Sequence, residues 1–94
     1  MEDGTEKRSN ETWLSELRKA DGEALADLRA YICRSLQTAL SGRAGQGDVE
    51  DFAQQALTRI LKSLDTFRGD SRFTTWATSV AIRIAFGELR RKQW

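Results

Sequence analysis

Apolar residues recur at helical spacing along nearly the whole chain, and no proline interrupts them. Positions three or four apart share one face of an α-helix, so this spacing predicts amphipathic helices. No β-branched run alternates with polar residues, as a half-buried strand would require. The 94 residues suffice for one domain with one modest core. We therefore expect an all-α fold, a compact bundle of three main helices plus a short N-terminal helix.

The first nine residues are highly charged and have no apolar periodicity. Such a composition is typical of a disordered tail, which we expect over residues 1–9, before a helical domain over residues 10–94. Asn10 or Thr12 could cap the first helix, and Asp48 is expected to cap the third. The expected helices cover residues 10–20, residues 23–40, a third segment that begins after Asp48, and residues 72–92.

Composition excludes several classes of site. The chain has no histidine, which is the usual general base near neutral pH and the commonest metal ligand, and it has one cysteine. We therefore expect no enzyme activity, no cofactor, no metal and no internal disulfide. No apolar run is long enough to span a bilayer, and the charged N-terminus does not resemble a signal peptide. A cytoplasmic protein without membrane insertion is expected.

The stretch from Phe67 to Trp76 reads FRGDSRFTTW and does not look like ordinary packing. Gly69 can take left-handed backbone angles at little cost, and Asp70 or Ser71 could cap the helix that follows. Cations and aromatic faces at a helix start suit a single nucleic-acid strand, with charge for phosphates and flat faces for bases. The alternative is that the aromatic residues are core side chains flanked by solvated arginines. We expect Trp76 to have a structural role rather than to contact nucleic acid.

The net charge of +1 hides an asymmetry along the chain. Residues 67–94 carry six basic and two acidic side chains, and the preceding residues carry nine basic and twelve acidic ones. Opposite signs at the two ends of a chain favour two faces with different partners. We expect a polyanion at the basic end and a protein at the other.

Three short motifs occur in order between Asp48 and Lys92: DVEDFAQQ at residues 48–55, FRGDSRFTTW at residues 67–76 and LRRK at residues 89–92. Their order and spacing resemble region 2 of bacterial RNA polymerase sigma factors, in the extracytoplasmic-function (ECF) group of the sigma-70 family. The chain departs from that pattern at Arg83, where the family often has Asn, and at Gly87, where it often has Asp.

The resemblance implies a helical fold like that of sigma region 2, with two binding surfaces. One surface would dock on the clamp coiled coil of the β′ subunit of core RNA polymerase. The other would recognise and melt the promoter −10 element by holding its non-template strand. The residues implied for polymerase binding are Asp48, Glu50, Asp51, Gln54, Gln55, Thr58 and Arg59. Those implied for DNA binding are Arg68, Gly69, Asp70, Ser71, Arg72, Phe73, Thr74, Thr75, Ser79, Arg83 and Arg90.

The same resemblance makes an anti-sigma factor a further candidate partner. A full sigma factor of this type continues into a helix-turn-helix, region 4, which we expect to be absent from this chain. Two rival interpretations remain on the residues alone. The first is a small helical protein–protein interaction module without nucleic-acid binding. The second is a helical domain that binds duplex DNA, although Phe73, Thr74 and Thr75 are poor readers of a major groove.

Overall fold

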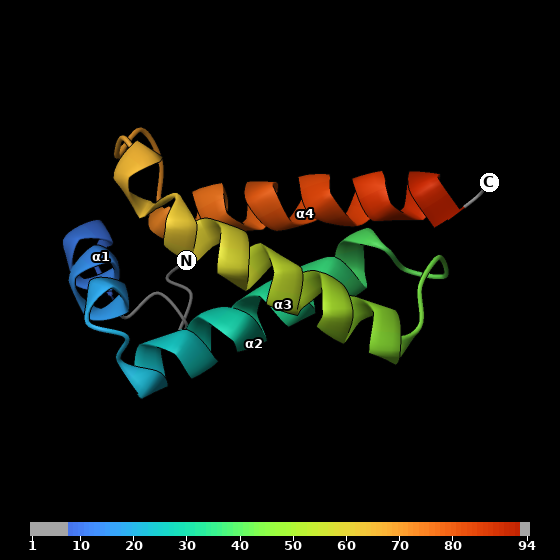
Figure 1. The fold of residues 1–94 in the computed structure, drawn as a ribbon, viewed down its shortest axis with the longest axis horizontal. Coiled ribbons are helices and arrows are strands. Elements are labelled where there is room, and N and C mark those ends of the chain that lie inside the picture. The colour runs from blue at the N-terminus through green and yellow to red at the C-terminus, as the bar shows by residue number, and fades with distance from the viewer. Residues whose placement is uncertain (1–7, 93–94) are drawn as a thin grey trace.

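The computed structural model describes residues 8–92 of the chain, and these residues form four α-helices and one short 3-10 helix (Figure 1). No strand occurs among them, and none of their helices is long and apolar enough to cross a membrane. The expectation of an all-α fold is therefore confirmed. The elements are α1 (Asn10–Arg18), α2 (Gly22–Ala39), α3 (Gln46–Lys62), η1 (Leu64–Thr66) and α4 (Phe73–Lys92).

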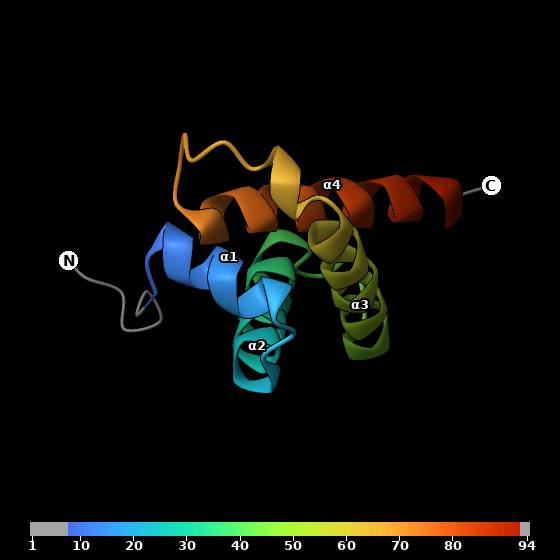
Figure 2. The same cartoon turned by 60° about the vertical axis from the view of Figure 1, so that its left-hand side comes forward.

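The three long helices pack against one another, and α1 closes one end of the bundle. Helices α2 and α3 run antiparallel, side by side, and α4 lies across both of them (Figures 1 and 2). α1 packs on α2 near the beginning of α4 (Figure 2). The two ends of the segment that joins α3 to α4 therefore lie close to α1.

Each helix buries one stripe of side chains in a common core. Helical spacing placed Phe73, Trp76, Ala77, Val80, Ala81 and Ile84 on the inner stripe of α4, but in the structure Trp76, Val80 and Ile84 are only half-buried. Small side chains of α4 occupy most of its fully buried positions, which face α2 and α3. Leu61 of α3 lies at helical spacing with the apolar residues of that helix, but it is 36% exposed. The fully buried stripe of α4 consists of Phe73, Thr74, Ala77, Ala81 and Ala85.

Two of the expected helix caps are wrong. Ser9, rather than Asn10 or Thr12, caps α1, because its Oγ accepts a hydrogen bond from the Thr12 N–H at 3.1 Å. Helix α3 begins at Gln46 after Gly45, and no side chain caps it. Asp48 therefore lies inside the first turn, where its negative charge still complements the helix dipole.

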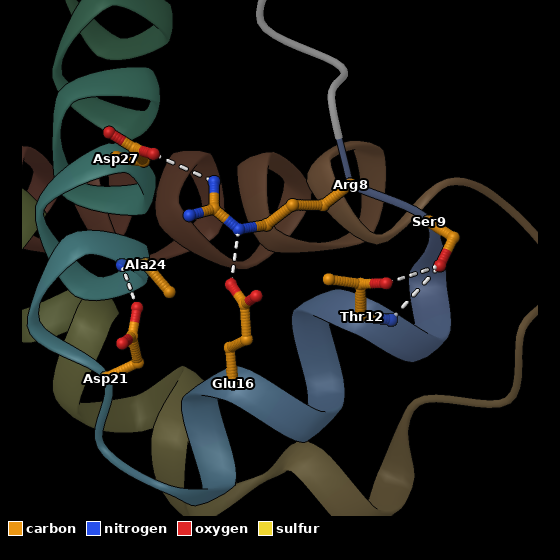
Figure 3. Close-up of polar contacts among 7 residues, drawn as sticks. All are labelled: Arg8, Ser9, Thr12, Glu16, Asp21, Ala24 and Asp27. Atoms are coloured by element: carbon orange, nitrogen blue, oxygen red, sulfur yellow. Dashed lines mark hydrogen bonds and ion pairs between the residues drawn. The ribbon is translucent and has the colours of Figure 1, made fainter.

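Arg8 and Ser9 belong to the folded part of the chain, although the sequence placed them in a tail (Figure 3). Arg8 Nε donates to Glu16 Oε1 at 2.6 Å, and its Nη1 donates to Asp27 Oδ2 at 2.8 Å. These hydrogen bonds, first that to Glu16, raise the pKa of Arg8 above its ordinary value. The guanidinium also lies 4.7 Å from the ring centroid of Trp13. One side chain thus joins α1 to α2, while residues 1–7 lie outside the described residues.

Candidate nucleic-acid and protein interfaces

Residues 67–72 form the loop between η1 and α4, which we call the arginine loop. Gly69 has φ +83°, the left-handed conformation that its position in the motif predicted. Residues 68–72 are all exposed. Within residues 8–92, neither Arg68 nor Arg72 forms an ion pair, so both guanidinium groups are available to a ligand.

The cap of α4 comes from a distant residue rather than from Asp70 or Ser71, so that expectation was wrong. Asn10 Oδ1 accepts a hydrogen bond from the Phe73 N–H at 2.8 Å. The Asn10 Nδ2 donates to the backbone carbonyl of Ser71 at 3.0 Å. The first turn of a helix has N–H groups without intrahelical partners, and one of them is satisfied here from α1. The exit of the arginine loop is thereby tied to α1.

Phe73 lies at the centre of an aromatic cluster, which leaves its side chain no exposed surface for the predicted contact with DNA. Its side chain is 0% exposed. The ring stacks against Trp13 at 5.6 Å and 22°, and Phe67 meets it edge-on at 5.4 Å and 82°. Trp76 lies 5.5 Å from Phe73 and 5.3 Å from Phe67, and it is half-buried. Trp76 therefore supports the loop while it keeps part of its ring at the surface.

Thr74 is 1% exposed, so its side chain also has almost no surface for the predicted contact with DNA. It belongs to the α4 stripe that faces α2 and α3. The other predicted positions on α4 lie on the opposite side of the helix and are exposed. These positions remain candidates for contact with a ligand: Thr75, Ser79, Arg83 and Arg90.

An open hollow of about 400 Å³, here the Trp76 hollow, lies between the end of α3, η1 and α4. It combines apolar walls, two hydroxyls and two guanidinium groups. The Thr66 hydroxyl donates to the Ser63 carbonyl at 2.7 Å, so its free lone pairs can only accept. The hollow was not predicted, because its lining comes from three separate elements. Its lining residues are Arg59, Ser63, Thr66, Trp76, Val80, Arg83 and Ile84.

A second hollow, of about 270 Å³, adjoins the first and is here called the Gly87 hollow. It shares Arg59, Arg83 and Ile84 with the Trp76 hollow. Neither Arg59 nor Arg83 has an ion-pair partner among residues 8–92, and Arg91 pairs with Glu88 at 3.3 Å. Three arginines and one glutamate give this hollow a positive balance. Its remaining lining residues are Gln55, Gly87, Glu88 and Arg91.

The outer face of α3 brings most of the predicted polymerase-binding residues together. A third hollow of about 530 Å³ is lined by Asp51, Gln54, Gln55, Thr58, Arg59 and Lys62. Glu50 is exposed one turn earlier, where it accepts a hydrogen bond from Gln46 at 3.1 Å, and Asp48 is half-buried. Arg59 lines all three hollows, so it lies where the two predicted surfaces meet.

Comparison with known proteins points to one family. Residues 23–94 match the family described as Sigma-70 region 2. The ECF RNA polymerase sigma-E factor of Escherichia coli (strain K12) is 30% identical over 81 residues, which cover 86% of this chain and 42% of that protein. The ECF RNA polymerase sigma factor SigW of Bacillus subtilis (strain 168) is 26% identical over 81 residues, covering 85% and 43%. No solved structure shows a significant match.

Proposed function

This chain belongs to the sigma-70 region 2 family, with relatives of the ECF type, and we propose that it binds core RNA polymerase and holds melted promoter DNA during transcription initiation. Sigma factors are initiation factors rather than enzymes, in agreement with the expectation from composition. The chain spans less than half the length of the curated relatives that it matches, so the proposal concerns the part played by this domain. Both partners would be met in the cytoplasm.

The observation that carries the proposal is the arginine loop beside the Trp76 hollow. A single strand needs cations along its backbone and a place for an unstacked base. Arg68 and Arg72 supply cations that have no ion-pair partner among residues 8–92, and the hollow supplies a half-buried indole with hydroxyls next to it. Stacking of one base on an aromatic side chain is worth about 1–3 kcal/mol, which suffices to offset much of the unstacking of a melted base.

The Gly87 hollow extends the same surface along α4. Guanidinium groups present only donors, which suit phosphate oxygens and base carbonyls. Arg59 and Arg83 reach both hollows, and Arg91 lies at the far end of the second. We therefore propose that a strand with one base in the Trp76 hollow continues along the Gly87 hollow toward the end of α4.

The outer face of α3 is the proposed docking surface for the β′ clamp coiled coil. Its amides, its hydroxyl and its charges of both signs can pair with either sign on a partner helix, as the polar part of a protein interface requires. The core of the bundle needs none of these side chains, because Gln54, Gln55 and Thr58 are all exposed. An anti-sigma factor that covers this face would compete with the polymerase.

The test uses this chain with core RNA polymerase and fluorescent oligonucleotides. We expect retention of core polymerase, and preferential binding of a −10-like non-template strand over a scrambled strand and over duplex of equal length. Replacement of both Arg68 and Arg72 by alanine should lower the log–log salt slope by roughly 0.7 for each lost phosphate contact. Arg34→Ala is the matched control, because Arg34 is an exposed arginine on α2 that lines none of the three hollows.

Two results would contradict the proposal. Equal affinity for single strand and duplex, in the presence of polymerase, would leave the protein-interaction module as the better interpretation. Unchanged promoter opening by the holoenzyme that carries both alanine substitutions would reduce the arginine loop to a connector.

A further inference from the structure

Helix α1 contacts the chain on both sides of Arg68, at η1 before the arginine loop and at the loop exit. At its first residue, Asn10 bonds to Ser71 and Phe73 at the loop exit. At its last residue, Arg18 Nη2 pairs with Asp65 Oδ1 at 3.1 Å, in η1 just before the loop. Nine helical residues span about 13 Å, which is the distance between these two attachments along α1. Figure 2 shows α1 lying beside the start of α4, with the loop above it.

The two bonds of Asn10 fall on the peptide groups on either side of Arg72. Its Oδ1 accepts from the Phe73 N–H, and its Nδ2 donates to the Ser71 carbonyl. A neutral carboxamide offers an acceptor and a donor side by side, which a carboxylate or a hydroxyl cannot do with this geometry. Holding both flanking peptide groups fixes the backbone angles of Arg72 and therefore the direction in which its side chain leaves the loop.

The end of α1 that carries Asn10 is held in place by packing and by ion pairs. Trp13, one turn later in α1, is 2% exposed and stacks on Phe73. Arg8 joins α1 to α2 through Glu16 and Asp27. The contact between α1 and the loop is therefore part of the packed structure and does not depend on the weak exposed pair of Arg18 and Asp65.

We propose that Asn10 is a positioning residue for strand binding, and that α1 aims Arg72 at the phosphate it would contact. The inference rests on the proposed function of the arginine loop. It assigns a role to a helix that precedes residues 23–94, the part of the chain matched by the family. A loop that is already ordered loses less conformational freedom on binding, so the strand binds more tightly.

The experiment measures the affinity of this chain for a −10-like non-template oligonucleotide, well below its melting temperature. Asn10→Ala removes both bonds and should weaken binding by up to about thirtyfold, the factor expected for two net hydrogen bonds. Asn10→Asp keeps an acceptor for the Phe73 N–H but turns an oxygen toward the Ser71 carbonyl, so it should also weaken binding. Ser9→Ala is the matched control, because it removes the cap of α1 without touching the loop.

A double-mutant cycle separates positioning from general stability. If Asn10 acts through Arg72, then Asn10→Ala should cost nothing further once Arg72 is alanine. In the parent background, Asn10→Ala should also lower the log–log salt slope of strand binding toward the slope of Arg72→Ala, which is roughly 0.7 below that of the parent. Without DNA, amide exchange at Phe73 should become faster in Asn10→Ala than in Ser9→Ala.

Additive losses in the cycle, or unchanged exchange at Phe73, would overturn the inference. So would an Asn10→Ala variant that binds the strand like the parent. A parent chain that shows no preference for single strand, even with polymerase present, would instead overturn the proposed function on which the inference rests. The two failures are therefore distinguishable in one series of measurements.

Discussion

Replacement of Gly69 by alanine tests the arginine loop through its backbone alone. Gly69 has φ +83°, and a Cβ added there would meet no heavy atom within 4 Å. The whole cost of Gly69→Ala is therefore conformational, about 1–2 kcal/mol for an L-residue in the left-handed region. Because the loop is exposed, the strain can be relieved by a change of loop conformation without unfolding of the bundle.

The expected result is a loss of strand affinity with little loss of global stability. A free-energy difference of about 1–2 kcal/mol corresponds to a factor of roughly five to thirty in the population of the native loop. Affinity for a −10-like oligonucleotide should fall by up to that factor, measured by fluorescence anisotropy. The melting temperature should fall by less than about 4 °C, the smallest shift expected if a full 1 kcal/mol were transmitted to a domain of this size.

Gly42 offers a matched control within the same chain. It has φ +78° and equally open surroundings, but it lies in the loop between α2 and α3. Gly42→Ala should introduce the same backbone strain and leave strand affinity unchanged. Equal losses of affinity in the two variants, or a Gly69→Ala variant that binds like the parent, would refute the reasoning.

Four further predictions concern other parts of the structure. Gly87→Ala should raise the free energy of unfolding by about 1 kcal/mol in urea titrations, because the position is helical and its Cβ would meet nothing within 4 Å; a loss would argue against helix there. Phe73→Leu should lower that free energy by roughly 1.5–4 kcal/mol, since three aromatic contacts are lost, and an unchanged value would refute the buried cluster. Arg8→Lys should cost about 1 kcal/mol, less at high salt, because Glu16 and Asp27 are partly solvated; a cost unaffected by salt would mean that packing dominates. Gln54→Ala combined with Thr58→Ala should reduce retention of core polymerase without changing the melting curve, and full retention would contradict the docking surface.

The helices themselves could be predicted, because their signal is local. Leu28, Ile32 and Leu36 recur at helical spacing and are buried as the pattern requires. The buried stripe of α4 could not be placed so well. Ala77, Ala81 and Ala85 face the core, because small side chains let helices approach closely. The prediction from helical spacing favoured the larger apolar residues of α4 instead.

The interfaces could be predicted only where their residues are close together in the sequence. The exposed side chains of α3 and the arginine loop lie within short motifs, so their grouping follows from the local sequence. The cap of α4 joins residues 63 positions apart, and no local rule would choose Asn10 over Asp70 or Ser71. The Trp76 hollow likewise depends on how η1 and α4 pack, so nothing in the local sequence identifies Ser63 and Thr66 as lining residues.

The stacking of Trp13 on Phe73 also bears on how the chain folds as it is made. The two rings are separated by about sixty residues of chain, and ribosomes add about 5–20 residues per second. Trp13 is therefore synthesised roughly 3–12 s before its partner ring exists. Helices α2 and α3 can pair during that interval, but the apolar side of α1 stays partly uncovered because the start of α4, which packs against it, is still missing. Nascent chains should accordingly be most vulnerable to proteases and most attractive to chaperones at α1, until the first turn of α4 has emerged.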